Sequence, residues 1–257
     1  MTVSDLPDAI ARLAATPRLL VALDFDGTVS PLVDNPSQSR VLPAARRAID
    51  ELETFHDTRV AFVSGRPMDG LVRVTEADDS ALLIASHGVE VRLSSGAVDV
   101  GLSAEERSSL AALGERLQQI VAGVQGAKVE HKPVGLGLHT RNVPLDDAAS
   151  AQAAARSAAA EIGGFIERDG KDILEFSVRD ATKGDGLQVL RRHLDATGVL
   201  FAGDDVTDED GFAVLGPDDV GIKVGDGETQ ARYRVADPDA VAEVLTALAE
   251  ARRAHLA

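Results

Sequence analysis

Short apolar runs recur along this chain, and segments with helical spacing separate several of them. The runs are Leu19–Leu23, Val60–Val63, Leu82–Ala85, Val199–Ala202 and Gly221–Val224. Continuous apolar runs of this length are typical of strands that are buried on both faces, as in a parallel sheet. Helical patterns cover 42–53 and 184–194, and a first helix is expected over 7–15, with Ser4 or Asp5 as its cap. The alternation of strand and helix predicts an α/β layered domain.

The middle of the chain has a different pattern. Residues 103–121 have helical spacing, with Ser103 and Glu106 as a capping box, and an Ala-rich helix is expected over 146–162. Four short strand-like runs accompany these helices, over 128–132, 135–140, 165–168 and 172–177, and the last two are expected to turn at Asp169-Gly170. We therefore expect a small α+β domain, 102–179, inserted into a core domain formed by 1–101 and 180–257.

Composition and charge narrow the classes of function. Hydrophobic residues make up 44% and aromatic residues only 3%, so a sizeable core must be aliphatic. The formal net charge of -16 repels nucleic acid and anionic lipid, and it would also repel a phosphorylated metabolite. An enzyme acting on such a metabolite therefore needs local positive charge. The chain has no cysteine and no apolar run near the ~20 residues of a spanning helix, so we expect a cytoplasmic protein without nucleic-acid or membrane partners.

Two aspartates stand two positions apart where the first apolar run ends, in Asp24-Phe25-Asp26-Gly27-Thr28. Positions i and i+2 of an extended chain face the same way, so both carboxylates project near the carboxyl end of the strand, where open α/β sheets bind ligands. Two close carboxylates repel each other, so one is protonated or a cation lies between them. A divalent ion that prefers oxygen ligands, such as Mg²⁺, suits this pair. Taken alone, the pattern also fits a strand followed by an acidic turn.

A second acidic cluster follows the apolar run that ends at Ala202 and comprises Gly203-Asp204-Asp205-Val206-Thr207-Asp208-Glu209-Asp210. Thr207 can cap a helix whose first turn holds Asp208, where acidic residues complement the helix macrodipole. This account does not cover Asp204 and Asp205, which stand at the strand end before the cap. Two acidic clusters at one edge of a sheet predict a site for a hard cation.

Lys183 and Ser64 add the positive charge and the hydroxyl that such a site would use. Lys183 opens the predicted helix 184–194, where a cation opposes the helix dipole and should have an anion to face. Ser64-Gly65-Arg66 follows another strand, so it offers a hydroxyl and open backbone N–H groups to a phosphate oxygen. In isolation, a solvated surface lysine and a plain turn would be the preferred explanations of these residues.

In combination, these features resemble the motifs of the haloacid dehalogenase-like superfamily of phosphotransferases. Asp24–Thr28 is similar to its first motif, Ser64 to its second, Lys183 to its third, and Gly203-Asp204-Asp205 with Asp208 to its fourth. The resemblance implies a Rossmann-like parallel-sheet core with an inserted α+β cap domain.

The resemblance narrows to the trehalose-6-phosphate phosphatase family over about Arg18 to Gly225. It is carried by the extended first motif 23–36, by 64–66, 86–90 and 203–210, and by the middle segments 129–132, 139–141, 170–171 and 174–175. Two places depart from the family: Thr140 stands where an aromatic residue is frequent, and Asp180-Ala181-Thr182 is less typical. Both bear on substrate identity more than on the chemistry.

The resemblance implies a magnesium-dependent phosphomonoesterase that hydrolyses trehalose 6-phosphate through an aspartyl-phosphate. Asp24 is then the nucleophile, Asp26 the general acid and base, and Ser64 and Lys183 stabilise the transferring group. The implied metal ligands are the Asp24 side chain, the Asp26 carbonyl and Asp204, with Asp205 and Asp208 supporting the ion or orienting Lys183. The implied substrate-binding residues are Arg66 in the core and, in the cap, Glu130, Lys132, His139, Arg141, Lys171 and Glu175.

Three alternatives stay open from the sequence. Another sugar phosphatase of the superfamily could act on sucrose phosphate or mannosylphosphoglycerate. A phospho-accepting receiver also uses acidic residues, a hydroxyl, a lysine and Mg²⁺, although the long insert and Asp26 argue against it. A non-catalytic sugar-phosphate-binding or scaffold subunit is the third. A functional coupling to a trehalose-6-phosphate synthase is compatible with the family resemblance.

Overall fold

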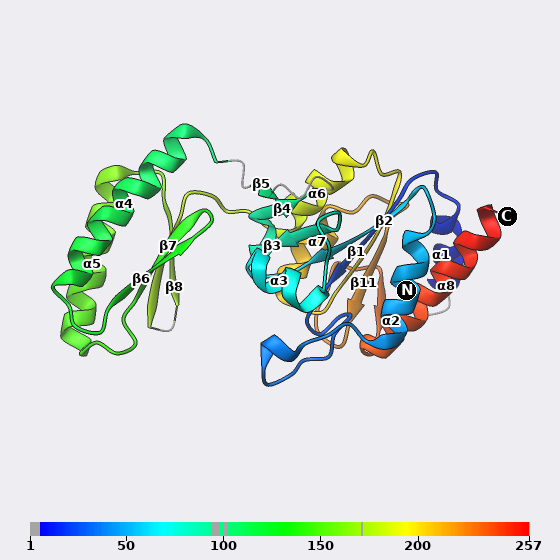
Figure 1. Cartoon of the computed structure of the whole chain (residues 1–257), viewed down its shortest axis with the longest axis horizontal. Helices are drawn as coiled ribbons and strands as arrows, with labels where there is room; N and C mark the ends of the chain where they lie inside the picture. The colour runs from blue at the N-terminus through cyan, green and yellow to red at the C-terminus, as the bar shows by residue number, and fades with distance from the viewer. Residues whose placement is uncertain (1–5, 94–97, 100–101, 171, 257) are drawn as a thin grey trace. The chain divides into compact units, whose positions relative to one another are not determined.

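The chain folds into two compact units. The structure, a computed structural model, describes residues 6–93, 98–99, 102–170 and 172–256 (Figure 1). The core unit comprises Met1–Asp99 and Ala181–Ala257, and the inserted unit comprises Val100–Asp180. The expected helix caps Ser4 and Asp5 and the expected substrate ligand Lys171 lie outside the described residues. Within the described part of the chain, no helix is both long and apolar enough to cross a membrane.

The core unit is built on one sheet of eight strands in the order β12-β11-β10-β1-β2-β3-β4-β5. The strands from β12 to β3 run parallel, and β4 and β5 continue the sheet antiparallel. The strands are β1 Leu19–Asp24, β2 Thr58–Val63, β3 Leu82–Ala85, β4 Glu90–Arg92, β5 Val98–Asp99, β10 Gly198–Gly203, β11 Val220–Val224 and β12 Tyr233–Val235. This arrangement confirms the predicted parallel-sheet α/β core.

Helices cover both faces of this sheet (Figure 1). The helices are α1 Leu6–Ala14, α2 Pro43–Glu53, α3 Met68–Thr75, α6 Lys183–His193, α7 Glu209–Ala213 and α8 Pro238–Leu256, with 3-10 turns η2 Pro36–Gln38, η3 Ser86–Gly88 and η4 Val206–Asp208. Along β1, Leu19 and Val21 pack under α1, α2, α3 and α8, whereas Leu20 and Ala22 pack against α6 and α7. A strand buried on both faces explains the continuous apolar runs in the sequence.

The inserted unit is a four-stranded antiparallel sheet, in the order β6-β7-β9-β8, with two helices on one face (Figure 1). Its elements are α4 Ala104–Ala122, β6 Lys128–Lys132, β7 Gly135–His139, α5 Leu145–Ile162, β8 Ile166–Gly170 and β9 Ile173–Ser177. The predicted capping box is confirmed, because Ser103 Oγ accepts from Glu106 N while the Glu106 carboxylate accepts from Ser103 N. Inward side chains of β7 and β9, Leu136, Leu138, Leu174 and Phe176, form a second aliphatic core with the helices.

Two local predictions were wrong. The turn expected at Asp169-Gly170 is not there, because both residues belong to β8 and pair with β9, Asp169 with Leu174 and Gly170 with Ile173. Thr207 does not cap the helix that follows, because it lies inside the 3-10 turn η4, and the N-cap residue of α7 is Asp208. The turn η4 is capped by Asp205, whose side chain accepts from Val206 N and forms a capping box with Asp208. Among the described residues, none hydrogen-bonds the buried Thr207 Oγ1.

Candidate active site

The carboxyl ends of neighbouring parallel strands bring the predicted motifs together. Strand β1 lies between β10 and β2, so Asp24 at its end has Asp204 on one side and Ser64 on the other. These residues line one cavity of about 490 Å³, together with Asp26, Arg66, His87, Lys183 and Asp205. The catalytic and metal-binding candidates that lie in the core unit therefore share one location, except Asp208, which is fully buried behind the cavity.

Lys183 is the positive centre of this cluster. Its Nζ lies 2.7 Å from Asp24 Oδ1 and 2.7 Å from Asp208 Oδ1, and its side chain is only 3% exposed. The expectation that this lysine faces an anion at the start of its helix is confirmed. Thr182 caps the helix and Asp185 completes a capping box, so the first turn that carries Lys183 is fixed by its own neighbours.

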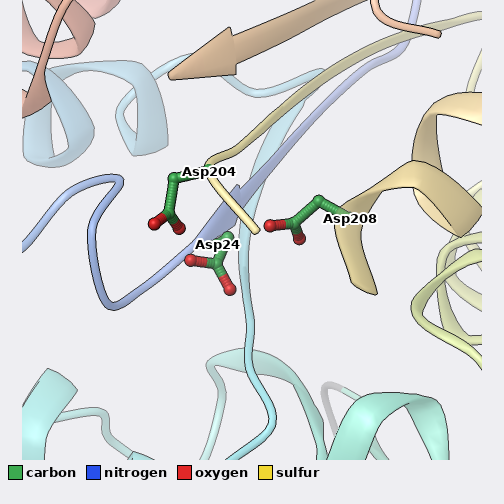
Figure 2. Close-up of side chains that lie close together, drawn as sticks. All are labelled: Asp24, Asp204 and Asp208. Carbon is green, nitrogen blue, oxygen red and sulfur yellow. The ribbon is translucent and has the colours of Figure 1, made fainter. Parts of the chain in front are cut away.

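Three carboxylates from the two acidic segments of the sequence lie close together here. Asp24, Asp204 and Asp208 each offer an oxygen within 4.8 Å of the others (Figure 2). Asp24 and Asp208 share Lys183, and Asp208 Oδ2 also accepts from Asp205 N at 2.9 Å. Asp204 accepts a long hydrogen bond of 3.3 Å from Thr28 Oγ1. Asp208 is thus committed to protein donors on both oxygens, whereas Asp24 and Asp204 keep oxygens directed to the cavity.

Glycine is required where Asp204 meets the loop after β1. Gly27 has a φ of +82°, and a Cβ placed there would lie 2.1 Å from Asp204 Oδ2. Any other residue would push the Asp204 carboxylate away and strain the backbone. The absence of a side chain at Gly27 therefore allows the fourth motif to approach the first.

Burial and mutual repulsion perturb the ionisation of this cluster. Burial raises the pKa of Asp24 well above its usual value, and Lys183 offsets only part of that rise. Burial and the neighbouring Asp208 likewise raise the pKa of Asp204. Burial lowers the pKa of Lys183, but Asp24 and Asp208 raise it more, so the ammonium stays charged. One lysine does not neutralise three clustered acids, and a bound cation would remove this excess of negative charge.

Asp26 is paired with Arg66. Arg66 Nε donates to Asp26 Oδ2 at 2.6 Å, and Arg66 Nη2 donates to Asp26 Oδ1 at 2.7 Å. The guanidinium also lies over the Phe25 ring, 5.7 Å from its centroid. The sequence left open whether one carboxylate is protonated or a cation lies between the two. In the structure each carboxylate has its own side-chain cation, Lys183 for Asp24 and Arg66 for Asp26.

Ser39 completes the Asp26–Arg66 pair and was missed from the sequence. Its hydroxyl donates to Asp26 Oδ1 at 3.1 Å and accepts from Arg66 Nη2 at 3.0 Å, and the residue is 1% exposed. Ser39 follows η2 in a polar loop, 13 positions from Asp26. No local pattern marks this serine, because its partners come from two other segments.

Four substrate-binding candidates of the inserted unit lie on the sheet face opposite its helices: Glu130, Lys132, His139 and Glu175. Glu130 and Glu175 flank Gly137 across three strands, and Lys132 is paired with Gly135. Glu130 Oε2 lies 2.8 Å from His139 Nε2, and Lys132 Nζ donates to Glu175. The glycines of β7, Gly135 and Gly137, thus leave a stretch of sheet surface without side chains, with charged groups on both sides of it. This stretch is called the glycine floor.

Two other residues of this unit lie apart from that floor. Arg141 is exposed in the turn after β7. Thr140, the departure from the family pattern, is 5% exposed and accepts from Gln152 of α5 at 3.2 Å. Its side chain therefore packs on the helix side, so the departure concerns packing rather than the charged face.

Comparisons with known proteins agree with this geometry. The sequence profile of the family described as Trehalose-phosphatase matches residues 22–239. The trehalose-phosphate phosphatase of Mycobacterium marinum is 30% identical over 263 residues, which cover 96% of this chain and 66% of that protein. The chain thus spans about two thirds of the length of this relative.

Two solved structures share the fold. The trehalose-6-phosphate phosphatase of Aspergillus fumigatus superposes with a TM-score of 0.71 at 22% identity, covering 97% of this chain and 98% of that one. A haloacid dehalogenase-like hydrolase of Bacillus subtilis gives a TM-score of 0.55 at 14% identity, covering 88% and 98%. Together with the family profile, which covers most of the chain, these likenesses confirm the resemblance seen in the motifs: the chain belongs to the trehalose-phosphatase family.

Proposed function

We propose that this protein hydrolyses trehalose 6-phosphate to trehalose and phosphate. Membership of the trehalose-phosphatase family supports the substrate. The observation that carries the chemistry is the position of Lys183, whose ammonium lies 2.7 Å from both Asp24 and Asp208 at the bottom of a cavity that Ser64 also lines. Such a centre is suited to bind a phosphate monoester, because it presents a nucleophile beside fixed positive charge.

The proposed reaction has two steps. In the first, Asp24 attacks phosphorus, the bond from phosphorus to the sugar oxygen breaks, and Asp26 gives its proton to that oxygen. In the second, a water molecule gives a proton to Asp26 and attacks the aspartyl-phosphate, which releases phosphate and restores Asp24. A carboxylate nucleophile favours this split, because the acyl phosphate is readily hydrolysed. The acid and base roles of Asp26 alternate, so its proton is recovered in each cycle.

Arg66 and Asp26 must exchange partners for this cycle to begin. The guanidinium holds both oxygens of Asp26, whereas the first step needs that carboxyl to carry a proton. A phosphate monoester is a better bidentate partner for an arginine than a single carboxylate, because it carries more charge. We propose that the substrate phosphate draws Arg66 away from Asp26, which leaves Asp26 able to take up a proton. Ser64 and Lys183 then stabilise the remaining oxygens of the phosphoryl group.

The donor set fits a magnesium ion. Asp24 and Asp204 present carboxylate oxygens to one point, burial and then the neighbouring Asp208 raise the pKa of each, and oxygen is the ligand that Mg²⁺ prefers. We propose Asp24, the Asp26 carbonyl and Asp204 as ligands, with Asp205 and Asp208 orienting the loop and Lys183. When bound, the ion would neutralise the carboxylates and draw charge from the phosphoryl oxygens.

The inserted unit is proposed to act as a cap that recognises the sugar. The charged side chains of this unit pair with one another beside the glycine floor. A polyol can take the place of these pairs, because the hydroxyls of the sugar form hydrogen bonds with the same side chains. Glu130, Lys132, His139, Arg141 and Glu175 are the proposed ligands, with Lys171 expected beside them. Closing the cap would exclude water from the first step.

Phosphate release from a panel of sugar phosphates tests the function. The panel holds trehalose 6-phosphate, sucrose phosphate, mannosylphosphoglycerate and glucose 6-phosphate, with and without EDTA. We expect trehalose 6-phosphate to give the highest kcat/KM, EDTA to stop release, and Asp24→Asn to abolish it. A higher kcat/KM for another sugar phosphate would mean that trehalose 6-phosphate is not the substrate. Normal turnover by Asp24→Asn would refute the mechanism with Asp24 as nucleophile. Capture of phosphate without turnover would favour a receiver or a binding subunit.

Substrate recognition by the inserted unit has its own test. Glu175→Ala should lower kcat/KM for the sugar phosphate by about 100-fold, because a buried hydrogen-bond partner of a hydroxyl is lost, and should spare a nitrophenyl phosphate. Glu167→Ala is the matched control, since Glu167 pairs with Arg156 of α5 on the opposite face of the same sheet. Equal losses on both substrates would remove Glu175 from sugar recognition.

The cellular setting is also a proposal. The chain has no cysteine, which fits the reducing cytoplasm that we propose as its location. Glycosyl transfer to a monosaccharide phosphate yields a disaccharide phosphate such as trehalose 6-phosphate, so we propose functional coupling to a trehalose-6-phosphate synthase. Phosphate release in a mixture with the synthase and its substrates would show whether the two steps run in sequence.

A further inference from the structure

We infer that Ser39 is a positioning residue for the acid–base carboxylate, and that it keeps Asp26 aimed at the leaving oxygen when Arg66 turns to the substrate. The inference rests on the proposed function and concerns how that site is held together. It starts from one buried hydroxyl that bridges two charged groups.

The hydroxyl of Ser39 bridges Asp26 and Arg66. Oγ donates its single proton to Asp26 Oδ1 at 3.1 Å and accepts from Arg66 Nη2 at 3.0 Å. At 1% exposure, the residue has no access to bulk water that could replace these bonds. Removing the Ser39 hydroxyl would take away one of the two hydrogen bonds that Asp26 Oδ1 accepts and leave the one from Arg66.

The backbone around Ser39 fixes where the hydroxyl points. Asn35 caps η2 by accepting from Ser37 N at 3.1 Å, and Arg40 Nη1 donates back to the Ser39 carbonyl at 2.7 Å. At the far end of the loop, Leu42 N donates to Val29 O at 2.8 Å and ties it to the first motif. These contacts lie outside the catalytic cavity, so they persist whatever Arg66 does.

Asp26 is held by two residues, Arg66 and Ser39, so it can lose its hydrogen bonds to Arg66 and keep the one to Ser39. Arg66 is 16% exposed at its side chain and lines the cavity, whereas Ser39 is buried behind it. A phosphate that enters the cavity can therefore reach Arg66 but not Ser39. If Arg66 leaves Asp26, the Ser39 hydroxyl is, within the described part of the chain, the remaining side-chain donor to that carboxyl. It keeps the carboxyl in place for proton transfer, which depends steeply on geometry.

The leaving group separates this role from a structural one. A sugar alkoxide is a strong base and needs a proton from Asp26 as it leaves, whereas a nitrophenolate leaves without one. Both esters form the same aspartyl-phosphate, so release of the alcohol in the first turnover must be measured rather than the steady state. The test uses the full-length protein with Mg²⁺, and rapid quench follows the first turnover of the best sugar phosphate from the panel and of nitrophenyl phosphate.

For Ser39→Ala we expect the first-turnover rate on the sugar phosphate to fall about 10-fold or more, with KM unchanged within about twofold. Nitrophenolate release in the first turnover should stay within about threefold and appear as a burst, because the second step also needs Asp26. Ser37→Ala, a serine on the same turn whose hydroxyl donates to Asn35 at 2.8 Å, should leave both rates unchanged.

A double-mutant cycle decides whether Ser39 acts through Asp26. In an Asp26→Asn background, Ser39→Ala should add less than about twofold to the loss on the sugar phosphate, because residues that act as one unit are not additive. Equal losses on the two esters, or a full additional loss in the Asp26→Asn background, would overturn the inference. The inference does not depend on which sugar is preferred, so a failed trehalose assignment leaves this test intact. A fully active Asp26→Asn would reject both the mechanism and the inference.

Discussion

Replacing Lys183 by methionine should expose how much buried charge this site carries. The substitution keeps an unbranched stem and removes the ammonium that lies 2.7 Å from Asp24 and 2.7 Å from Asp208. Breaking a buried ion pair by removing one partner costs about 3–5 kcal/mol, because the other charge stays buried without compensation. Here two carboxylates lose their cation beside Asp204, so we expect the metal-free variant to be less stable by about 5 kcal/mol at pH 7.

The deficit should grow as the pH rises. Burial raises the pKa of Asp24 above its unfolded value, and Lys183 is the neighbour that lowers it, so its loss raises that pKa further. A carboxyl group whose folded pKa exceeds its unfolded pKa binds more protons in the folded state. Stability therefore falls as the pH rises through the interval between the two values, and this fall is larger in the variant.

Hydrogen exchange at the amides of β1 is the appropriate measurement, because it reports on the core unit alone. Metal-free parent and Lys183→Met are compared at pH 5 and pH 7, and then with Mg²⁺. The matched control is Lys223→Met, since Lys223 is also buried, at 4% exposure, and donates to the backbone carbonyl of Asp204. We expect the control to lose about 1–3 kcal/mol at both pH values. A Lys183→Met deficit below about 1 kcal/mol at pH 7, or one that is equal at both pH values, would refute the electrostatic argument.

Three other predictions concern the metal and the two units. Mg²⁺ at about 100 times its Kd should stabilise the folded core unit by about 2.7 kcal/mol, which would be measured as a rise in the thermal midpoint of unfolding. In Asp204→Asn, most of this rise should be absent. Arg252 is 1% exposed and donates to the Thr58 hydroxyl, the Ala14 carbonyl and three further carbonyl groups. Arg252→Ala should therefore lower the free energy of unfolding in urea by about 3 kcal/mol. Arg253→Ala, at the exposed neighbouring residue, should lower it by less than about 1 kcal/mol, and similar losses in the two variants would contradict the burial argument. The hydrogen bond from Arg179 lowers the pKa of Glu106 from 4.5 to about 2, so the inserted unit should lose stability as the pH falls through that interval. Circular dichroism would follow this loss in the parent and in Glu106→Gln. An equal loss in the variant would show that a group other than Glu106 causes the pH dependence.

The sequence by itself determined the fold class and most residues of the core-unit site, although not Ser39. Apolar runs predicted strands buried on both faces, and residues that follow a buried strand must emerge at its end. Asp24, Ser64 and Asp204 could therefore be placed at strand ends, and Lys183 at a helix start, without any structure. The capping box at Ser103 was equally accessible, because both of its partners lie within one turn of helix. Each of these features depends on interactions among residues close in sequence.

Only the tertiary structure decided which of these groups are partners. Asp26 meets Arg66, 40 positions away, and Ser39, 13 positions away, although the sequence favoured substrate as the partner of Arg66. The strand order of the sheet places β1 between β10 and β2, and this order brings Asp204 and Ser64 to either side of Asp24. Local patterns fix where a side chain leaves the backbone, but the partner it meets depends on strand order and loop packing, which are set by contacts distant in sequence.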